Sequence, residues 1–385
     1  MPSKAILRLS SMRRYALREL KSIACAFLGS SVRPDVWLMD GTEVLSGDHF
    51  SLLHVGTAGH KNYIGHLVFN GDFKETHIGR TFSVSAGHVI KRNTFDCSLM
   101  IVEVGSLGRK VCEREQDFYV PLFVQGEVDI PLVAHNESAR SDIRRIRRNH
   151  LDFVVTTQPG QFRAFYYDMY LPYVTQRYHD RLLLMDYDEM MQKARQGDTE
   201  LLLVRKGTEF IGGAVIAFDR GLPKLWSVGI KDGNLSYWRD GVVAAVYYFS
   251  SMCLAERGHK RIHVGSSRAF LSNGVLRYKR KWGMRVVGHW PPIGFLLKPL
   301  SLSQGLRGFL LRNPFLCIDK GRLCSAVFAE NDEVRSDRSL ERLHKHHYLA
   351  GISKASIYRF GEGESKTWFI PEECAPRLGS ESGLT

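Results

Sequence analysis

A loop that combines glycines with cations is the first place in this sequence where chemistry could occur. Residues 231–241 read KDGNLSYWRDG, and four of them suit a phosphate group: Lys231, Gly233, Arg239 and Gly241. A helix is predicted directly afterwards, over 242–257, and the free N–H groups and the dipole at a helix N-terminus favour an anion. The loop therefore predicts a site for a phosphate-bearing donor. A solvated turn capped by Asp240 is the other interpretation, because the loop lacks a compact glycine-rich spacing.

A cluster of arginines forms the strongest charge feature. On a helix, Arg140, Arg144 and Arg148 lie one turn apart on one stripe. Several guanidinium groups that point the same way suit a phosphate or a carboxylate. We predict substrate contacts at Arg144 and Arg148, and the alternative is a solvated basic face paired with acids.

Aromatic and small polar residues supply further candidates. Tyr170 belongs to a tyrosine-rich helix predicted over 159–178, most of whose rings would pack in the core. Trp226 lies on a predicted strand and could line a donor channel. Ser267 and Arg268 follow a buried strand, at the end of a sheet where ligands of α/β proteins tend to bind. Ser267 could instead cap the next helix.

Neither a general base nor a metal site stands out. Three acids are equally weak candidates for the base: Asp168, Asp219 and Asp240. The run HKHH at 344–347 is no ligand set, because neighbouring histidines on a helix face different directions and no partner has matching spacing. We expect no metal, and the sequence holds no P-loop, nucleophile elbow or dinucleotide fingerprint.

The elements that must position these residues follow an α/β pattern. Over 136–300 their order is β-α-α-β-β-β-α-β-α-β-β, which starts after a short helix capped at Ser141-Asp142 and ends in a strand pair, MRVVGHW and GFLLKPL. Short alternating apolar runs in 1–135 predict strands. Residues 301–385 predict a hairpin, a polar helix and a strand.

Two segments of the N-terminal region need separate interpretation. The segment 117–131, DFYVPLFVQGEVDIP, has two prolines and no periodicity, so we expect an ordered connector there. Residues 1–31 are rich in arginine and predict an amphipathic helix that packs on the domain, with a membrane contact left open. A cleaved leader is the less economical interpretation.

Length and composition limit the class of protein. The 385 residues suggest two or three domains, and a formal charge of +13 favours anionic partners. No apolar run is long enough for a membrane-spanning helix. The seven cysteines are scattered and odd in number, which predicts a reducing compartment, the cytoplasm, rather than a disulfide scaffold.

The order of elements over 140–300 resembles the acyl-CoA N-acyltransferase (GNAT) fold and, more narrowly, the FemAB-like group, in which two such domains stand in tandem. Four segments carry the likeness: SARSDIRRIRRNHL (138–151), FYYDMYLPYVTQRY (165–178), GGA (212–214) and GSSRAFLSNGVLRYKRKWG (265–283). The last is the most specific, because the family often has a small-residue turn and then a helix that ends in a Lys-aromatic-Gly cluster. Here that cluster is Lys279, Trp282 and Gly283.

The resemblance implies an α/β fold of two tandem GNAT-like domains, with mixed, mostly antiparallel sheets flanked by helices. Residues 1–135 would be a degenerate first copy, 136–300 the acyltransferase domain, and 301–385 an extension that packs on the sheets. The implied reaction moves an acyl group from acyl-CoA or an acyl carrier protein thioester to an amine of a sugar, amino acid or cell-envelope precursor. The thioester is a co-substrate, and no tightly bound cofactor is implied. Lys279 joins the expected substrate contacts of this bacterial-type enzyme.

Two alternatives remain open. A tRNA-dependent aminoacyltransferase of the FemAB type would need a long helical hairpin, for which 178–200 leaves no room. The other alternative is a non-catalytic module whose basic face binds RNA or membrane lipid. Nucleic acid is not favoured as a partner, and a peripheral membrane contact is left open.

Overall fold

The structure, a computed structural model, describes most of the chain from residue 33 onward. The described ranges are 33–69, 72–81, 96–105, 117–177, 184–218, 221–289, 292–330, 336–360 and, for the backbone, 369–374. The helix expected over 1–31 therefore lies outside the described residues.

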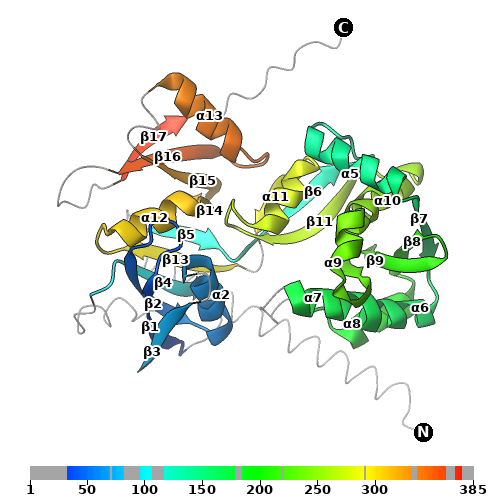
Figure 1. The fold of residues 1–385 in the computed structure, drawn as a ribbon, viewed down its shortest axis with the longest axis horizontal. Helices are drawn as coiled ribbons and strands as arrows, with labels where there is room; N and C mark the ends of the chain where they lie inside the picture. The colour runs from blue at the N-terminus through cyan, green and yellow to red at the C-terminus, as the bar shows by residue number, and fades with distance from the viewer. Residues whose placement is uncertain are drawn as a thin grey trace.

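The first unit is a six-stranded sheet with the order β3-β1-β2-β4-β13-β5 (Figure 1). Its strands are β1 (Asp35–Thr42), β2 (His49–Gly56), β3 (Phe73–Arg80), β4 (Leu99–Gly105), β5 (Phe118–Pro121) and β13 (Ile293–Pro299). Helices α2 (Ala58–Phe69) and α12 (Gln304–Arg312) cover one face. Both lie on the same face because Phe50 of β2 packs against Phe69 of α2 and Phe309 of α12.

The second unit is a seven-stranded sheet with the order β12-β6-β11-β10-β9-β8-β7. Its strands are β6 (Phe123–Asp129), β7 (Leu151–Thr156), β8 (Thr199–Lys206), β9 (Glu209–Ala217), β10 (Lys224–Ile230), β11 (Arg261–Arg268) and β12 (Arg285–His289). Its α-helices are α5 (Glu137–Arg148), α6 (Pro159–Ala164), α7 (Leu171–Arg177), α8 (Tyr187–Gln196), α9 (Leu235–Asp240), α10 (Val242–Glu256) and α11 (Gly274–Lys281). A π-helical segment, Phe165–Tyr170, joins α6 to α7.

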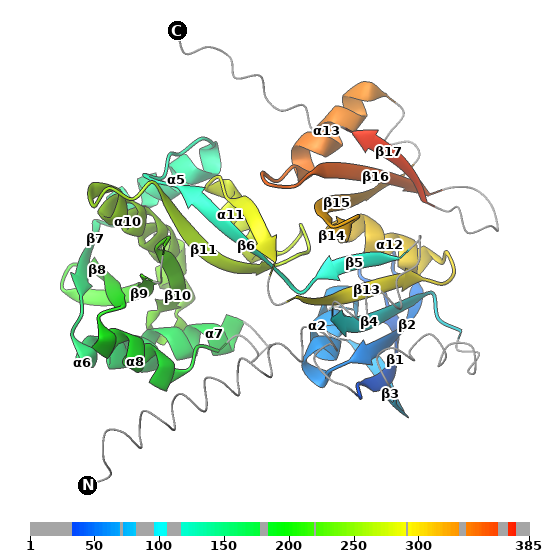
Figure 2. The same ribbon diagram turned by 180° about the vertical axis from the view of Figure 1, so that it is seen from behind.

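The two sheets share an arrangement of six strands. The order β3-β1-β2-β4-β13-β5 corresponds to β8-β9-β10-β11-β6-β12, and each corresponding pair runs in the same relative direction. The connectivity differs, since β3 follows β2 along the chain whereas β8 precedes β9, and β7 extends the second sheet. Each unit also gives one strand to the other, since β6 lies in the second sheet and β13 in the first (Figure 2). The predicted fold class, tandem α/β domains with mostly antiparallel sheets flanked by helices, is confirmed.

The exchanged strands correct two expectations. The segment 117–131 is not a connector but holds β5 and β6, and β5 shows no periodicity because its four residues are all buried. The strands β12 and β13 do not pair with each other, since they join different sheets. The domain limits at 135 and 300 stay a prediction, and the exchange carries one strand across each of them.

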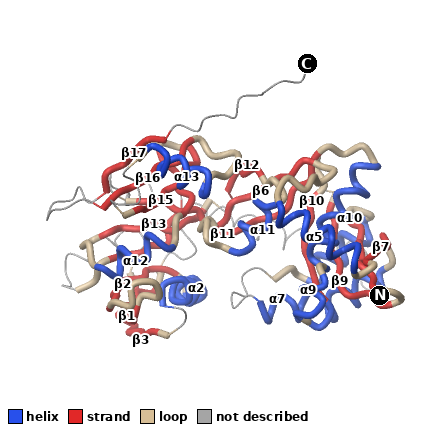
Figure 3. Tube along the Cα trace, turned by 45° about the horizontal axis from the view of Figure 1, so that its top comes forward, coloured by secondary structure: helices blue, strands red, loops and turns tan. Residues whose placement is uncertain are grey.

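A four-stranded sheet completes the described chain, with the order β14-β15-β16-β17. Its elements are β14 (Phe315–Asp319), β15 (Arg322–Ala329), β16 (Lys354–Phe360), β17 (Phe369–Cys374) and α13 (Asp337–His347). Phe118 of β5 packs edge-on against Phe315 and Tyr358 of this sheet, so the extension lies against the first unit (Figure 3). No helix of the described ranges is long and apolar enough to cross a membrane.

Short polar signals set the helix ends of the second unit. Asp186 caps α8 and Gly197 ends it in the left-handed conformation, as the sequence predicts. Asn136, rather than Ser141-Asp142, caps α5, so this helix begins earlier than expected. Gly229 lets the π-helical segment lie directly on β10, because a Cβ there would be 2.7 Å from the Tyr170 amide nitrogen.

Candidate active site

A cleft opens in the second sheet where two parallel strands separate. β10 and β11 pair only at Lys224 and His263, and a pocket of about 340 Å³ lies beyond this point. Both strands carry an irregularity here, since the pairing of β11 with β6 shifts after His263 and the pairing of β10 with β9 shifts after Leu225. Gly265 allows the bend in β11 with a φ of 73°, which disfavours other residues.

Aromatic rings from several elements contribute to the walls of the cleft. Six rings from six elements line it: Tyr170, Tyr173, Trp226, Trp238, Tyr247 and Tyr278. Tyr170 is held in place because its hydroxyl oxygen accepts a hydrogen bond of 2.7 Å from the Met185 amide. Near Trp238, the Arg177 guanidinium lies over the rings of Tyr173 and Trp238, at 5.6 and 5.9 Å.

Lys279 reaches the cleft from α11 and is almost fully buried. Its Nζ donates a hydrogen bond of 2.8 Å to the Ser266 carbonyl oxygen, and the side chain lines the pocket. Burial and the nearby Lys224 lower the pKa of Lys279 to about 7. Its amine therefore exists in both protonation states near neutral pH, which suits a group that exchanges protons with a substrate.

The predicted phosphate loop is folded and largely paired within the protein. It forms a 3₁₀ turn at Lys231–Gly233 and the short helix α9. Lys231 bonds to Glu209 at 2.6 Å, and hydrogen bonds from Lys231 and Tyr237 lower the pKa of Glu209. Of this segment, Trp238 is the residue that lines the cleft.

The glycines of this loop serve packing. A Cβ at Gly233 would lie 2.5 Å from the Gln176 side-chain oxygen, and one at Gly241 would lie 3.3 Å from the Arg145 Cβ. The N-terminus of α10 is thus packed beside α5, and Arg239 is exposed away from the pocket lining. The prediction that these residues bind a phosphate has no support in their positions.

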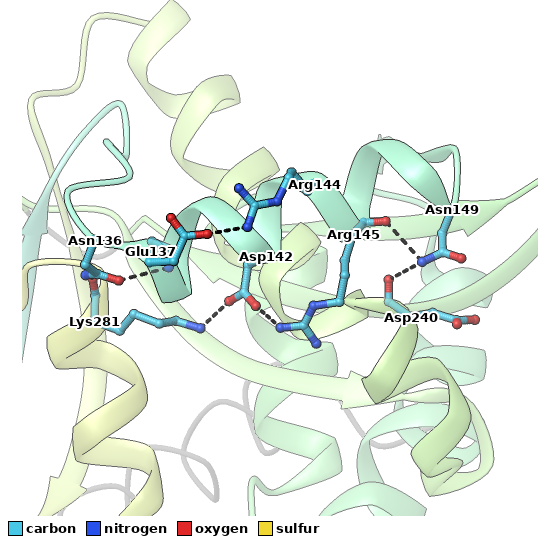
Figure 4. Close-up of polar contacts among 9 residues, drawn as sticks. Asn136, Glu137, Asp142, Arg144, Arg145, Asn149, Asp240 and Lys281 are labelled. Atoms are coloured by element: carbon cyan, nitrogen blue, oxygen red, sulfur yellow. Dashed lines mark hydrogen bonds and ion pairs between the residues drawn. The ribbon is translucent and has the colours of Figure 1, made fainter.

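Three arginines of α5 pair with acids of the same helix, and Figure 4 shows two of these pairs, Arg144 with Glu137 and Arg145 with Asp142. Arg140 donates to Glu137 at 3.0 Å, and Arg144 bonds to the same carboxylate. These two guanidinium groups lower the pKa of Glu137. Neither Arg144 nor the exposed Arg148 lines the cleft, so the described site does not include them.

A buried carboxylate on α5 connects this helix to the cleft wall. Asp142 contacts both Lys281 of α11 and Arg145 (Figure 4). Asn149 donates to the Asp240 carbonyl oxygen at 2.9 Å and thereby ties α5 to the end of α9. α5 therefore helps to position α9 and α11, and the sequence analysis missed this role of Asp142 because it treated the residue as a cap.

Ser267 and Arg268 lie deeper, between the two units. The Arg268 guanidinium is stacked between Tyr63 of α2 and Phe123 of β6, with its central carbon 4.1 and 4.3 Å from their ring centres. Ser267 is buried and does not cap α11, since Asn273 does so. Neither Ser267 nor Arg268 lines the cleft.

The structure therefore brings together three of the predicted site residues, Tyr170, Trp226 and Lys279. It adds Arg177 and Lys224, which no sequence signal singled out because each is one cation among many. None of the three acids considered as a general base is found among the described residues that line the cleft. Asp240 pairs with Lys206 at 2.8 Å, Asp168 is exposed, and Asp219 lies outside the described residues.

The fold and the cleft define a class, a tandem mixed α/β protein with exchanged strands and a ligand-sized opening in its second sheet. No protein-family model matches the chain, and no curated protein does.

Solved structures similar to this chain include FemX, at a TM-score of 0.34 and 11% identity over 65% of this chain and 81% of FemX. The structure of L-PGS from Bacillus licheniformis is similar at a TM-score of 0.32 and 9% identity, over 72% of this chain and 85% of that one. A tandem GNAT protein from the clavulanic acid biosynthesis pathway is similar at a TM-score of 0.26 and 8% identity, over 66% and 79%. The FemAB-like and GNAT proteins named from the sequence are thus among the similar structures. Because all three TM-scores lie below 0.5, the chemistry below is drawn from this chain's own residues.

Proposed function

We propose that this protein transfers an acyl group from a thioester donor to an amine, with the donor held between β10 and β11. The separation of these two strands is the observation that carries the proposal. Strands that part leave backbone N–H and C=O groups without a neighbouring strand, and the amides of an extended carrier arm can bond to such edges. The aromatic walls exclude water from a reactive thioester.

Lys279 is the residue to which we assign the proton transfer. The acceptor amine enters the reaction in its neutral form, after its ammonium has lost a proton to solvent. It attacks the thioester carbonyl, and neutral Lys279 takes the proton that the nitrogen loses as the C–N bond forms. When the C–S bond breaks, Lys279 passes this proton to the departing thiolate, so the lysine side chain is returned to its neutral state.

A thioester carrier, acyl-CoA or an acyl carrier protein, fits better than aminoacyl-tRNA as the donor. The described residues between α7 and β8 hold one helix, α8, and not a long helical arm. A cytoplasmic location is part of the proposal, and it is supported by Cys97, Cys253 and Cys324, which are buried free thiols among the described residues.

Release of free thiol from acyl-CoA or acyl carrier protein, measured across a panel of amines, tests the proposal. We expect amine-dependent thiol release that Lys279→Met abolishes and Lys345→Met, an exposed control on α13, preserves. The absence of amine-dependent release with every donor and acceptor would reject the transferase proposal. Equal rates for the two variants would reject the role of Lys279.

A further inference from the structure

The cleft carries positive charge that the described chain does not neutralise. Arg177, Lys224 and Lys279 line it, and none of its described lining residues is an aspartate or a glutamate. Three other lysines of the same unit pair with carboxylates: Lys206 with Asp240, Lys231 with Glu209 and Lys281 with Asp142.

The titration of neighbouring groups reflects this excess charge. Besides burial, the positive charge of Lys224 lowers the pKa of Lys279. Burial, then Lys224 and Lys279, lower the pKa of His263 to about 4. The charge of Lys224 at the mouth of the parted strands therefore disfavours the protonation of Lys279 and His263, and an anion placed there would relieve this repulsion.

The remainder of the cleft is suited to an apolar body. Six aromatic rings line it. Its volume of about 340 Å³ lies at the lower end of the range for small-molecule sites. A ligand that joins an apolar portion to a negative group would satisfy both the rings and the lysines.

We propose that the occupant of the cleft combines an apolar body with an anionic group, a carboxylate or a phosphate, that lies between Lys224 and Lys279. This inference rests on the proposed function and names the substrate class of the same site. The anionic group has two sources, the phosphate of a phosphopantetheine arm or the carboxylate of an acylated amino acid. The two sources share the chemistry that the lysines recognise.

A matched set of probes tests the inference on the full chain, with tryptophan fluorescence as the readout because Trp226 and Trp238 line the cleft. The probes share an octyl or octanoyl body: N-octanoylglycine, its methyl ester, octyl phosphate and octylamine. Phosphopantetheine and pantetheine form a second pair. We expect each anion to bind about tenfold or more tightly than its neutral partner, since a hydrogen bond to a charged group contributes about 1.5–3 kcal/mol.

Variants locate the charge preference. Lys224→Met and Lys279→Met should each remove the preference for anions while the methyl ester binds as before, and Lys345→Met should change neither. Lys224 is only half-buried, so its variant carries the test if Lys279→Met does not fold. A preference shown only by N-octanoylglycine over its ester identifies the anionic group as the carboxylate of an acylated amino acid. A preference shown only by phosphopantetheine over pantetheine identifies it as the phosphate of the carrier arm.

Equal affinity for N-octanoylglycine and its ester, and for the phosphopantetheine pair, would overturn the inference, as would tightest binding of octylamine. Those results would leave the transferase proposal standing if amine-dependent thiol release is observed. Failure of that release with intact anion preference would instead reject the transferase proposal alone.

Discussion

A pair of parallel strands stays hydrogen-bonded over several positions in one unit of this protein, and the corresponding pair in the other unit separates to form the cleft. In the first sheet, β2 and β4 run parallel and pair at four successive positions, from Leu52 with Leu99 to Val55 with Val102. In the second sheet, the corresponding strands β10 and β11 pair at one position, Lys224 with His263. The same order and direction of strands thus gives a continuous sheet in the first unit and a ligand-sized cleft in the second.

A carboxylate of the protein itself occupies the corresponding place in the first unit. Glu103 lies in the last part of β4 and is 2% exposed. Its Oε2 accepts a hydrogen bond of 3.1 Å from the Thr57 amide, just before α2, and lies 2.8 Å from the His60 Nδ1. A Cβ at Gly56 would lie 2.8 Å from the same carboxylate. The space that a ligand would need in this unit is therefore filled by its own side chains.

The contrast teaches that a few residues decide between a core and a site. Gly265 and the irregular pairing around it turn β11 away from β10. Glu103 and His60 hold the end of the first sheet closed.

Removal of the Lys279 amine should have the largest effect. We expect Lys279→Met to lower kcat/KM for thiol release by about 10²–10⁴-fold, the usual contribution of a positioned proton-transfer group. Circular dichroism should show a folded protein, since methionine preserves the length and apolar stem of the side chain. A loss below threefold would contradict the assignment.

Removal of the charge on Glu103 should affect stability and not the cleft. Glu103→Gln weakens the contacts with Thr57 and His60, so we expect the free energy of unfolding to fall by about 1.5–3 kcal/mol in urea titrations. Probe affinity in the second unit should be unchanged. The exposed Glu256→Gln serves as the control and should be neutral. A change in cleft affinity would show that the two units are coupled.

A matched pair of glycine variants separates backbone strain from cleft geometry. Gly265→Ala and Gly258→Ala each place an alanine at a positive φ, 73° and 87°, so each should cost about 1–2 kcal/mol of stability. Only Gly265 borders the cleft. We expect the Gly265 variant alone to weaken probe binding. Equal binding by the two variants would show that the bend in β11 does not determine the opening of the cleft.

The pH dependence of the reaction should depend on the charges around Lys279. Because the neutral amine accepts the proton, kcat/KM should rise with pH through a pKa of about 7. Of the groups that face it, Lys224 lowers this pKa, and His263 is neutral near pH 7 since its own pKa is about 4. Lys224→Met should therefore raise the pKa of Lys279 and move the rising limb to higher pH. A rising part of the pH profile that stays in place in this variant, or moves to lower pH, would contradict the interaction between Lys224 and Lys279.

The second unit shows how far local signals reach. The predicted strand after the arginine cluster is β7, the proline at 159 begins α6, and the meander from β8 to β10 is present with the expected turn at Gly207. These elements are legible because their caps and alternating apolar residues act within a few positions of each other. The helix α9 was missed since none of its residues is buried, so it has no apolar stripe to detect.

The exchanged strands show where local signals end. β5 is buried throughout, and β13 is buried except at Pro299, so their residues have almost no polar face that would give a period of two. Their partners lie far along the chain, because β13 inserts between β4 and β5. No sequence pattern within β13 specifies that insertion.

The sequence by itself indicated the class of fold, the two ends of α8, and Lys279, Tyr170 and Trp226 as candidates that the structure brings together. Tertiary structure alone decided which cations remain available to a ligand. Lys231 and Lys224 look alike as residues, yet Lys231 meets the Glu209 carboxylate of β9 and Lys224 faces a cleft whose described lining has no carboxylate. The physical reason is that a charge acts on a ligand only when the folded chain supplies no closer partner, and that depends on distances between elements remote in sequence.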